Sequence, residues 1–333
     1  MSAAVPRPAA TRRQPGTTWL LAHPQDIHCV FYHMACLAGY GTAFYYYLHP
    51  QEVGLTTTAS KVAFVFGAAL MLGWASGVDV GVNFHNHAHV PIFRSRVLSR
   101  WFGRLWTISG GWPAFFWHHS HVTVHHLHLL DPAIDWTLPK RKADGTLEGY
   151  VRYSLLHWPW RYGVHLWRDF RARPELGRKA LLEFAIFLPL WSIPFWIDPV
   201  MALCLWVFPQ WIGNVSFMAA GMYVQHVACV PKTPAQPLEH SNIFTQRAFN
   251  LFMFNIGYHL EHHDHPSVHW SDLPALHERL KPELISNGAR VHNDHGYFRN
   301  AARFGFDFRG DAVEKFSRHP HAYQENATAA GPR

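Results

Sequence analysis

The chain has 333 residues, of which 49% are hydrophobic and only 15% are charged, and its formal net charge is +7. So few charged residues are unusual for a soluble protein of this size. The basic residues are spread over loops and tails and lack the basic–aromatic interleaving of nucleic-acid-binding proteins. The sequence therefore favours an anionic membrane surface over nucleic acid as a partner.

Four long apolar runs follow an N-terminal segment, residues 1–18, whose content of Pro, Ala, Thr and Arg predicts disorder. The runs form two pairs: 27–48 with 61–84, and 180–197 with 200–224. A membrane-spanning helix needs about 20 such residues, so the runs predict four transmembrane helices in two hairpins. Buried helices of a soluble bundle are the alternative, which the length and near absence of charge in each run disfavour.

The distribution of Lys and Arg predicts how these helices cross the bilayer. The loop 49–60 and the Asp198-Pro199 turn contain neither residue, whereas the segment 85–179 contains 14 of them. By the positive-inside rule, that segment and both termini are cytoplasmic. The predicted fold class is therefore an all-α, multi-pass integral membrane protein with a cytosolic helical cap.

Three histidine clusters lie outside the apolar runs, at 85–89 ("HNHAH"), 117–126 ("WHHSHVTVHH") and 259–266 ("HLEHHDHP"). Histidines four residues apart project from one face of a helix. This spacing joins His85 to His89, and His121 to His125 with His126 one step round. His259, His262 and His263 form a further stripe, and His226 after the last apolar run is the ninth candidate.

So many imidazoles require a partner. Each buried polar group left unsatisfied costs about 1–3 kcal/mol, so these rings must be hydrated or bound to something. Neutral imidazole is the commonest protein ligand of transition metals. Nine ligands exceed the needs of one metal ion, and the sequence therefore predicts two ions.

The clusters resemble the histidine boxes of the membrane fatty acid desaturase superfamily, which includes lipid hydroxylases, alkane monooxygenases and carotenoid ketolases. "GVNFHNHAHVPIFRSR" (81–96) and "NIGYHLEHHDHPSVHWSDLPALHERL" (255–280) extend the likeness, which covers residues 27–280. The resemblance implies that residues 19–280 form a catalytic membrane domain. The composition of 281–333, rich in His and Arg, predicts a polar cytosolic segment with a disordered tail from about 318. The resemblance also implies a cytosolic non-haem centre of two iron ions, which uses O2 and external electrons to attack an alkyl chain. The implied ligands are His85, His89, His121, His125, His126, His226, His259, His262 and His263.

Some residues depart from the family pattern or extend it. Asn86 stands where the first box usually has an acidic residue, and His118 shares a helical stripe with His121 and could replace a ligand of the second box. Four side chains are predicted to support the ligands from outside: Asp79, Asn255, Glu261 and Asp264. Asp131 and Asp135 are further candidates for this role. The extra histidines, His87, His119, His128 and His265, are expected to be hydrogen-bonded or exposed rather than to bind metal.

Three functions remain open at this point. The leading expectation is an acyl-lipid desaturase, and the second is a hydroxylase or ketolase of a lipid, alkane or carotenoid with the same iron site. The third is a non-enzymatic membrane protein that binds or transports a divalent metal, although transport sites usually lie near the bilayer midplane.

The electrons for either enzyme must come from another protein. The sequence has no Gly-rich nucleotide-binding fingerprint and no H-P-G-G haem-binding stretch. A ferredoxin, or a small b-type cytochrome with its reductase, is therefore the expected donor. Basic residues in 94–104 and 161–179 could dock such an acidic donor or contact anionic lipid headgroups.

Overall fold

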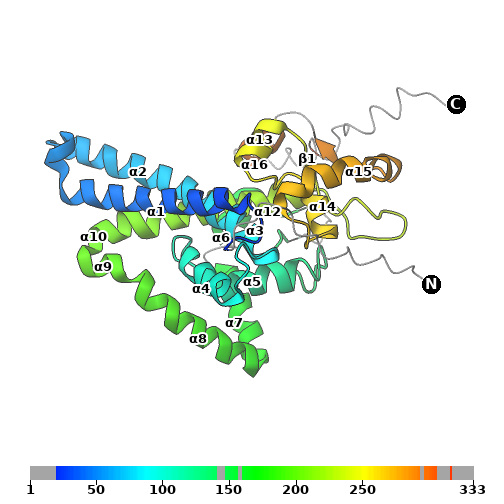
Figure 1. The fold of residues 1–333 in the computed structure, drawn as a ribbon, viewed down its shortest axis with the longest axis horizontal. Coiled ribbons are helices and arrows are strands. Elements are labelled where there is room, and N and C mark those ends of the chain that lie inside the picture. Colours follow the sequence, from blue (N-terminus) through cyan, green and yellow to red (C-terminus); the bar gives the residue numbers. More distant parts are fainter. Residues whose placement is uncertain (1–19, 141–146, 157–159, 293–295, 306–315, 317–333) are drawn as a thin grey trace.

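The computed structural model describes residues 20–140, 147–156, 160–292, 296–305 and 316. The segments predicted to be disordered, 1–18 and the tail from about 318, lie outside these residues. The described chain is mostly helical, as the sequence predicts, and a long arm of helices meets a wider cap (Figure 1).

The arm is built from the four predicted apolar runs. α1 (Asp26–Leu48) lies beside α2 (Thr58–Val78), which continues through the π-helix η2 (Asp79–Phe84) into α3 (His85–His89). α8 (Pro174–Trp191) and α9 (Ile193–Ile197) form the third run. The fourth is a continuous path of short α- and π-helical pieces: α10 (Pro199–Ala202), η5 (Leu203–Val207), α11 (Phe208–Ile212), η6 (Gly213–Met218) and α12 (Ala219–His226).

Three helices of the described chain are long and apolar enough to cross a membrane: Thr58–His89, Pro174–Ile197 and Pro199–His226. They match three of the four predicted spans. α1 forms with 23 residues but does not join these three, because its five tyrosines and the imidazoles of His28 and His33 lower its hydropathy.

Glycines bring α2 and the fourth run into close contact. A Cβ added at Gly73 would lie 2.7 Å from Ile212 Cγ2, and one added at Gly213 would lie 2.8 Å from the carbonyl oxygen of Gly73. Small residues allow this close approach between membrane helices, where packing rather than the hydrophobic effect drives association.

A larger side chain at this contact should destabilise the arm. A Cβ added at Gly77 would lie 2.7 Å from Phe217 Cβ, whereas nothing lies within 4 Å of one added at Gly67 on the same helix. Because overpacking costs about 1–3 kcal/mol, we expect Gly77→Leu to lower the thermal unfolding midpoint of the detergent-solubilised chain. Gly67→Leu is the control, and equal midpoints for the two variants would contradict this packing.

The cap surrounds the cytosolic-facing ends predicted for the arm helices. It includes two short strands, β1 (Ile243–Phe244) and β2 (Val291–His292), which pair in parallel. The short helix η1 (Pro50–Val53) is not part of the cap, because it joins α1 to α2 at the far tip of the arm. The helices of the cap are α4 (Arg96–Trp106), α5 (Ala114–His118), η3 (His119–His125), α6 (Tyr150–Leu156), α7 (Tyr162–Ala172), α13 (Arg247–Phe252), α14 (His259–Asp264), η7 (Trp270–Asp272), α15 (Leu273–Ser286) and α16 (Gly296–Gly305). Residue 280, the predicted end of the catalytic domain, lies inside α15, so residues on both sides of it share one helix.

Candidate metal centre

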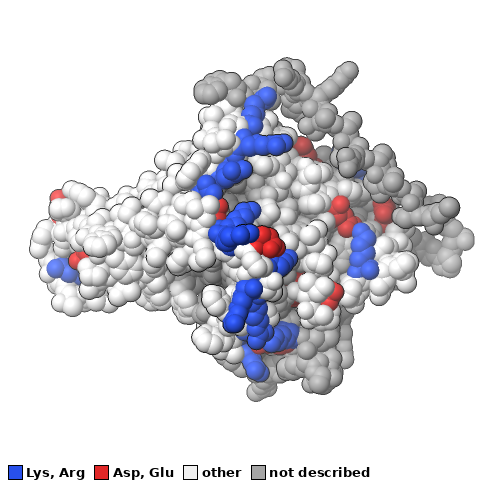
Figure 2. All heavy atoms as spheres, turned by 90° about the horizontal axis from the view of Figure 1, so that it is seen from below, with Lys and Arg blue, Asp and Glu red and all other residues white. Residues whose placement is uncertain are grey.

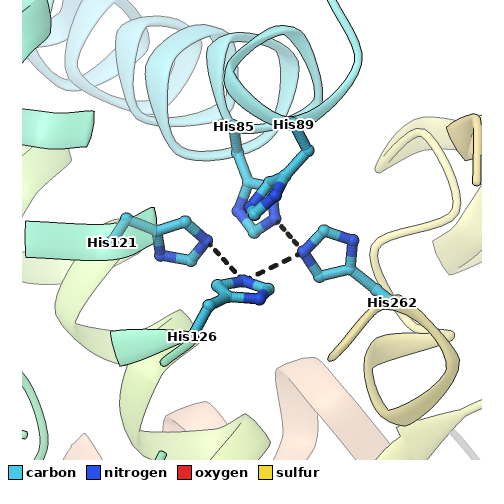
Figure 3. A group of neighbouring side chains, drawn as sticks. All are labelled: His85, His89, His121, His126 and His262. Carbon is cyan, nitrogen blue, oxygen red and sulfur yellow. Dashed lines mark hydrogen bonds between the residues drawn. The ribbon is translucent and has the colours of Figure 1, made fainter. Parts of the chain in front are cut away.

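Five of the nine predicted histidines face one point, and we call them the five-histidine group: His85, His89, His121, His126 and His262 (Figure 3). The first two come from α3, the next from η3, His126 from the position directly after η3, and His262 from α14. Their ligand nitrogens all lie within 4.8 Å of one another. The Nε2 atoms of His85 and His262 are 2.8 Å apart, and those of His121 and His126 are 3.1 Å apart. Metal–nitrogen bonds of about 2.1 Å place neighbouring ligand nitrogens about 3 Å apart, so this spacing suits a shared metal ion.

The other four form a second cluster, the four-histidine group: His125, His226, His259 and His263. The Nε2 atoms of His226 and His259 are 3.0 Å apart, and those of His259 and His263 are 3.1 Å apart. The two groups adjoin, since the rings of His126 and His263 stack with centroids 4.2 Å apart. The structure thus brings all nine predicted histidines together in two groups, each spaced to bind a metal ion.

A π-helix decides how the second cluster of the sequence is shared between the groups. In η3 the backbone N–H of His126 donates to the carbonyl oxygen of His121, five residues earlier, at 2.9 Å. This wider turn aligns His121 with His126 and sends His125 to the other group. The prediction that His121 and His125 share one face, which assumed an α-helix, is therefore wrong, and π-turns of this kind are frequent at functional sites.

The other two spacings give a mixed result. His85 and His89 do share one group, as their α-helical spacing predicts. His259 and His263 also belong together, but His262 points into the five-histidine group rather than along the same stripe. The short helix α14 therefore serves both groups from two of its faces.

The chemistry of these rings fits a metal ion. The Nε2 atoms of His89 and His125 are buried and have no hydrogen-bond partner among the described residues, and a bound ion would satisfy them. Burial, reinforced by neighbouring imidazoles, holds the pKa of the cap histidines His121, His126, His259, His262 and His263 well below the ordinary imidazole value. These rings are therefore neutral at neutral pH, which is the form that binds metal.

Comparison with protein families identifies the chain. The family model described as "Fatty acid desaturase" matches residues 60–294. The chain belongs to the fatty acid desaturase family. The match starts in α2 and ends beyond β2, so it covers both histidine groups and confirms the resemblance seen in the sequence. A comparison with the curated proteins found no match.

Membership of the desaturase family gives the groups a context. The family implies an oxidoreductase that modifies lipids at a membrane, and the apolar helices of this chain agree with that setting. The two histidine groups are compatible with metal sites, for which the family suggests a non-haem di-iron centre.

One carboxylate orients a histidine of this desaturase-family centre directly. Asp135 is buried, and its Oδ2 lies 3.1 Å from Nδ1 of His125. Its Oδ1 accepts hydrogen bonds from the backbone N–H and the hydroxyl of Thr137. Such a partner fixes the ring and aims its other nitrogen at the metal. Of the two aspartates considered for this role, Asp131 instead accepts a bond from the backbone N–H of Ala133.

The four side chains predicted to support the ligands make their hydrogen bonds elsewhere. Asp79 lies between His33 Nδ1, at 2.7 Å, and Trp106 Nε1, at 2.8 Å. Asn255 has a left-handed backbone (φ 61°) and donates to the carbonyl oxygen of Trp270.

The two acidic side chains of α14 point away from the groups as well. Glu261 pairs with His277 of α15. Asp264 binds Lys232 at 2.7 Å and lies 3.3 Å from His240 Nε2. His240 in turn lies 3.3 Å, through its carbonyl oxygen, from Nδ1 of His226, so Asp264 is one residue removed from the four-histidine group.

The remaining histidines of the boxes lie outside both groups. His118 is exposed on α5 and does not replace a ligand of the second box. His87 contacts the carbonyl oxygen of Ser99, and His119 pairs with Asp169, as expected for extra histidines. His128 is exposed and His265 partly so. Asn86, at the position where the family usually has an acid, is buried, and its Nδ2 has no partner among the described residues.

An apolar cavity of about 50 Å3 adjoins both groups. His85, His121 and His259 form part of its wall, together with Trp117 of α5. The rest of the lining is mostly apolar, with the side chains of Val82, Phe217, Met218, Met222, Phe249 and Met253. A short segment of an alkyl chain in this space would lie beside both sets of ligands.

Proposed function

We propose that the nine grouped histidines hold two iron ions and that the chain is an O2-dependent desaturase of a fatty acyl chain. The observation that carries the proposal is the apolar cavity whose wall includes histidines of both groups. Imidazole ligands add no negative charge to the ions, and family membership supports iron over other metals.

The overall reaction sets what each part must do. Two hydrogens leave adjacent methylenes to form the double bond, and O2 takes up two electrons and two protons in addition to become two waters. Iron at the histidines would supply this oxidising chemistry. The electrons would come from a separate donor, a ferredoxin or a b-type cytochrome with its reductase.

The chain's own residues would position the substrate and the ligands. The apolar lining would hold the alkyl chain against the wall formed by His85, His121 and His259 and exclude water. Asp135 would keep Nε2 of His125 aimed at its metal. Within the cavity, Ser120 and Tyr162 are hydrogen-bonded to each other, which satisfies their polarity beside an apolar substrate.

We also propose four membrane spans, with both termini and the histidines on the cytoplasmic side. From Thr58 to His85 the second span is about 40 Å long at 1.5 Å per residue, which exceeds the roughly 30 Å of the hydrocarbon core and carries the histidines beyond it. α1 would be the fourth span, because its outer face exposes large apolar side chains, among them Phe31 at 74% and Met34 at 54%. In this arrangement residues 19–280 form the catalytic unit, and 281–333 continue it in the cytosol.

A mass comparison of lipids tests the proposed reaction. Total lipids would be compared between hosts that express the chain, its His125→Ala variant or the surface control His118→Ala, with a compatible electron donor and candidate acyl and carotenoid substrates present. We expect a new species two mass units lighter with the chain and with His118→Ala, and none with His125→Ala.

Other products would change the proposal in defined ways. A species sixteen units heavier, or fourteen for a ketone, would replace desaturation by hydroxylation or ketolation at the same centre. The desaturase proposal also fails if the His125→Ala variant makes the same product as the parent.

A further inference from the structure

A second cavity, which we call the α4–α8 groove, opens on the surface away from the proposed substrate cavity. It has a volume of about 320 Å3. α5 separates the two: it presents Phe115 and His118 to the groove and Trp117 to the substrate cavity. The groove is therefore a distinct site rather than an extension of the metal centre.

The charges in the groove favour an anion. Its lining contains Arg96, Arg100 and Arg104 of α4, Lys179 of α8 and one carboxylate, Glu183. Glu183 is already paired with Arg104 through two contacts of 2.6 and 2.9 Å. Among the described residues no carboxylate lies within ion-pair distance of Arg96, Arg100 or Lys179. Lys179 Nζ lies 4.3 Å from the centre of the Phe115 ring, so these three exposed cations face the groove without an anionic partner.

The helix α4 has an apolar row beside its cationic row. Arg96, Arg100 and Arg104 follow one another at four-residue intervals, and Val97, Trp101 and Leu105 do the same on the adjoining stripe. These three apolar side chains are 65%, 47% and 49% exposed. A helix with such neighbouring rows is typical of the membrane interface, where the apolar row enters the acyl region and the cations stay at headgroup level.

The groove also lies where a candidate span begins. Lys179 is in the second turn of the span Pro174–Ile197, and the next exposed residues, Leu181 and Leu182, are 72% and 58% exposed. Figure 2 shows the same transition on a larger scale: Lys and Arg form a band where the arm, uncharged except near its tip, meets the cap. In a membrane this band would stand at the level of the lipid phosphates.

We propose that the α4–α8 groove binds the headgroup of an anionic phospholipid, with its phosphate held by Arg96, Arg100 and Lys179. The guanidinium fork matches phosphate oxygens in pairs. The acyl chains would run along Trp101, Leu105 and Leu181. This assignment rests on the membrane placement proposed above. A lipid fits better than an acidic protein, because exposed apolar side chains lie beside the cations. Acyl chains would bury these side chains, whereas an acidic protein surface would not.

Thermal unfolding of the full chain in a neutral detergent tests this site. We expect phosphatidylglycerol to raise the unfolding midpoint by roughly 3 °C or more, and phosphatidylcholine or inorganic phosphate at the same concentration to raise it much less. The triple variant Arg96→Gln/Arg100→Gln/Lys179→Gln should lose most of the shift. The control Arg279→Gln, at an exposed position of α15, should keep it.

Several outcomes would overturn the proposal. They are an equal shift with phosphatidylcholine, an equal shift with inorganic phosphate alone, and a triple variant that keeps the full response. If the triple variant does not fold, the single variant Arg100→Gln replaces it, and it should lose part of the shift. An acidic electron donor whose binding needs these cations, together with no response to phosphatidylglycerol, would assign the groove to a protein.

The readout needs neither iron nor turnover, so the two proposals fail separately. A missing lipid response would leave the desaturase reaction standing. A missing double bond in the lipid analysis would leave the groove and its ligand untouched.

Discussion

Replacing His262 by Ala should abolish product formation, with a loss greater than the roughly 10–100-fold that removal of an outer partner of a ligand causes. His262 lies 2.8 Å from His85 and 3.2 Å from His126, between Nε2 atoms, so its ring joins ligands from two other elements. Its loss leaves the five-histidine group without the only member contributed by α14. Product formation would be measured in the lipids of a host that supplies an electron donor.

Neighbouring residues provide matched comparisons for this result. His263→Ala removes a proposed ligand of the four-histidine group and should also abolish the product, because the proposed oxidation uses both ions. His265→Ala lies two residues further on, outside both groups, and should retain the parent activity. Activity in His262→Ala comparable to that of His265→Ala would contradict the assignment of the five-histidine group.

Replacing Asp135 by Asn should weaken metal binding about 10–100-fold and reduce activity by a similar factor. The carboxylate holds Nδ1 of His125 at 3.1 Å, and Asn at this position keeps the size but loses the charge that fixes the ring. Competition with a chelator would measure the affinity for iron.

Asp131→Asn is the control for this variant. Asp131 lies four residues before Asp135, but its side chain accepts a hydrogen bond from the backbone N–H of Ala133 rather than from a histidine. We expect its iron affinity and activity to match those of the parent. Equal affinities for the two variants would show that Asp135 does not orient His125.

The sequence predicts the ligands better than their arrangement. The nine histidines stand out because their residue type and spacing are unusual, and all nine lie in the two groups. Their division depends on the π-turn of η3, which changes the residue paired with His121 from His125 to His126. The amino-acid sequence of the second box does not distinguish an α-turn from a π-turn. The assignment of its histidines to the two groups could therefore not be predicted.

Contacts between distant residues were equally out of reach. Asp26 and His269, which are 243 residues apart, meet at 2.8 Å, and His33 meets Asp79 across 46 residues at 2.7 Å. Asp79 was expected near the ligands because it lies close to His85 in the sequence. Its side chain instead faces α1 and α4, where it contacts His33 and Trp106.

The fold was predictable where hydropathy alone decides it. Three of the four apolar runs are candidate spans. α1 shows the limit, because its histidines and tyrosines serve specific contacts, such as that of His33 with Asp79, at the expense of hydropathy.

The most direct test of the central claim is the metal content of the purified chain after expression with ample iron. Two histidine groups predict two iron ions per chain, falling to about one or fewer when either group loses a ligand. One iron ion in the intact chain, or zinc in place of iron, would contradict the di-iron centre.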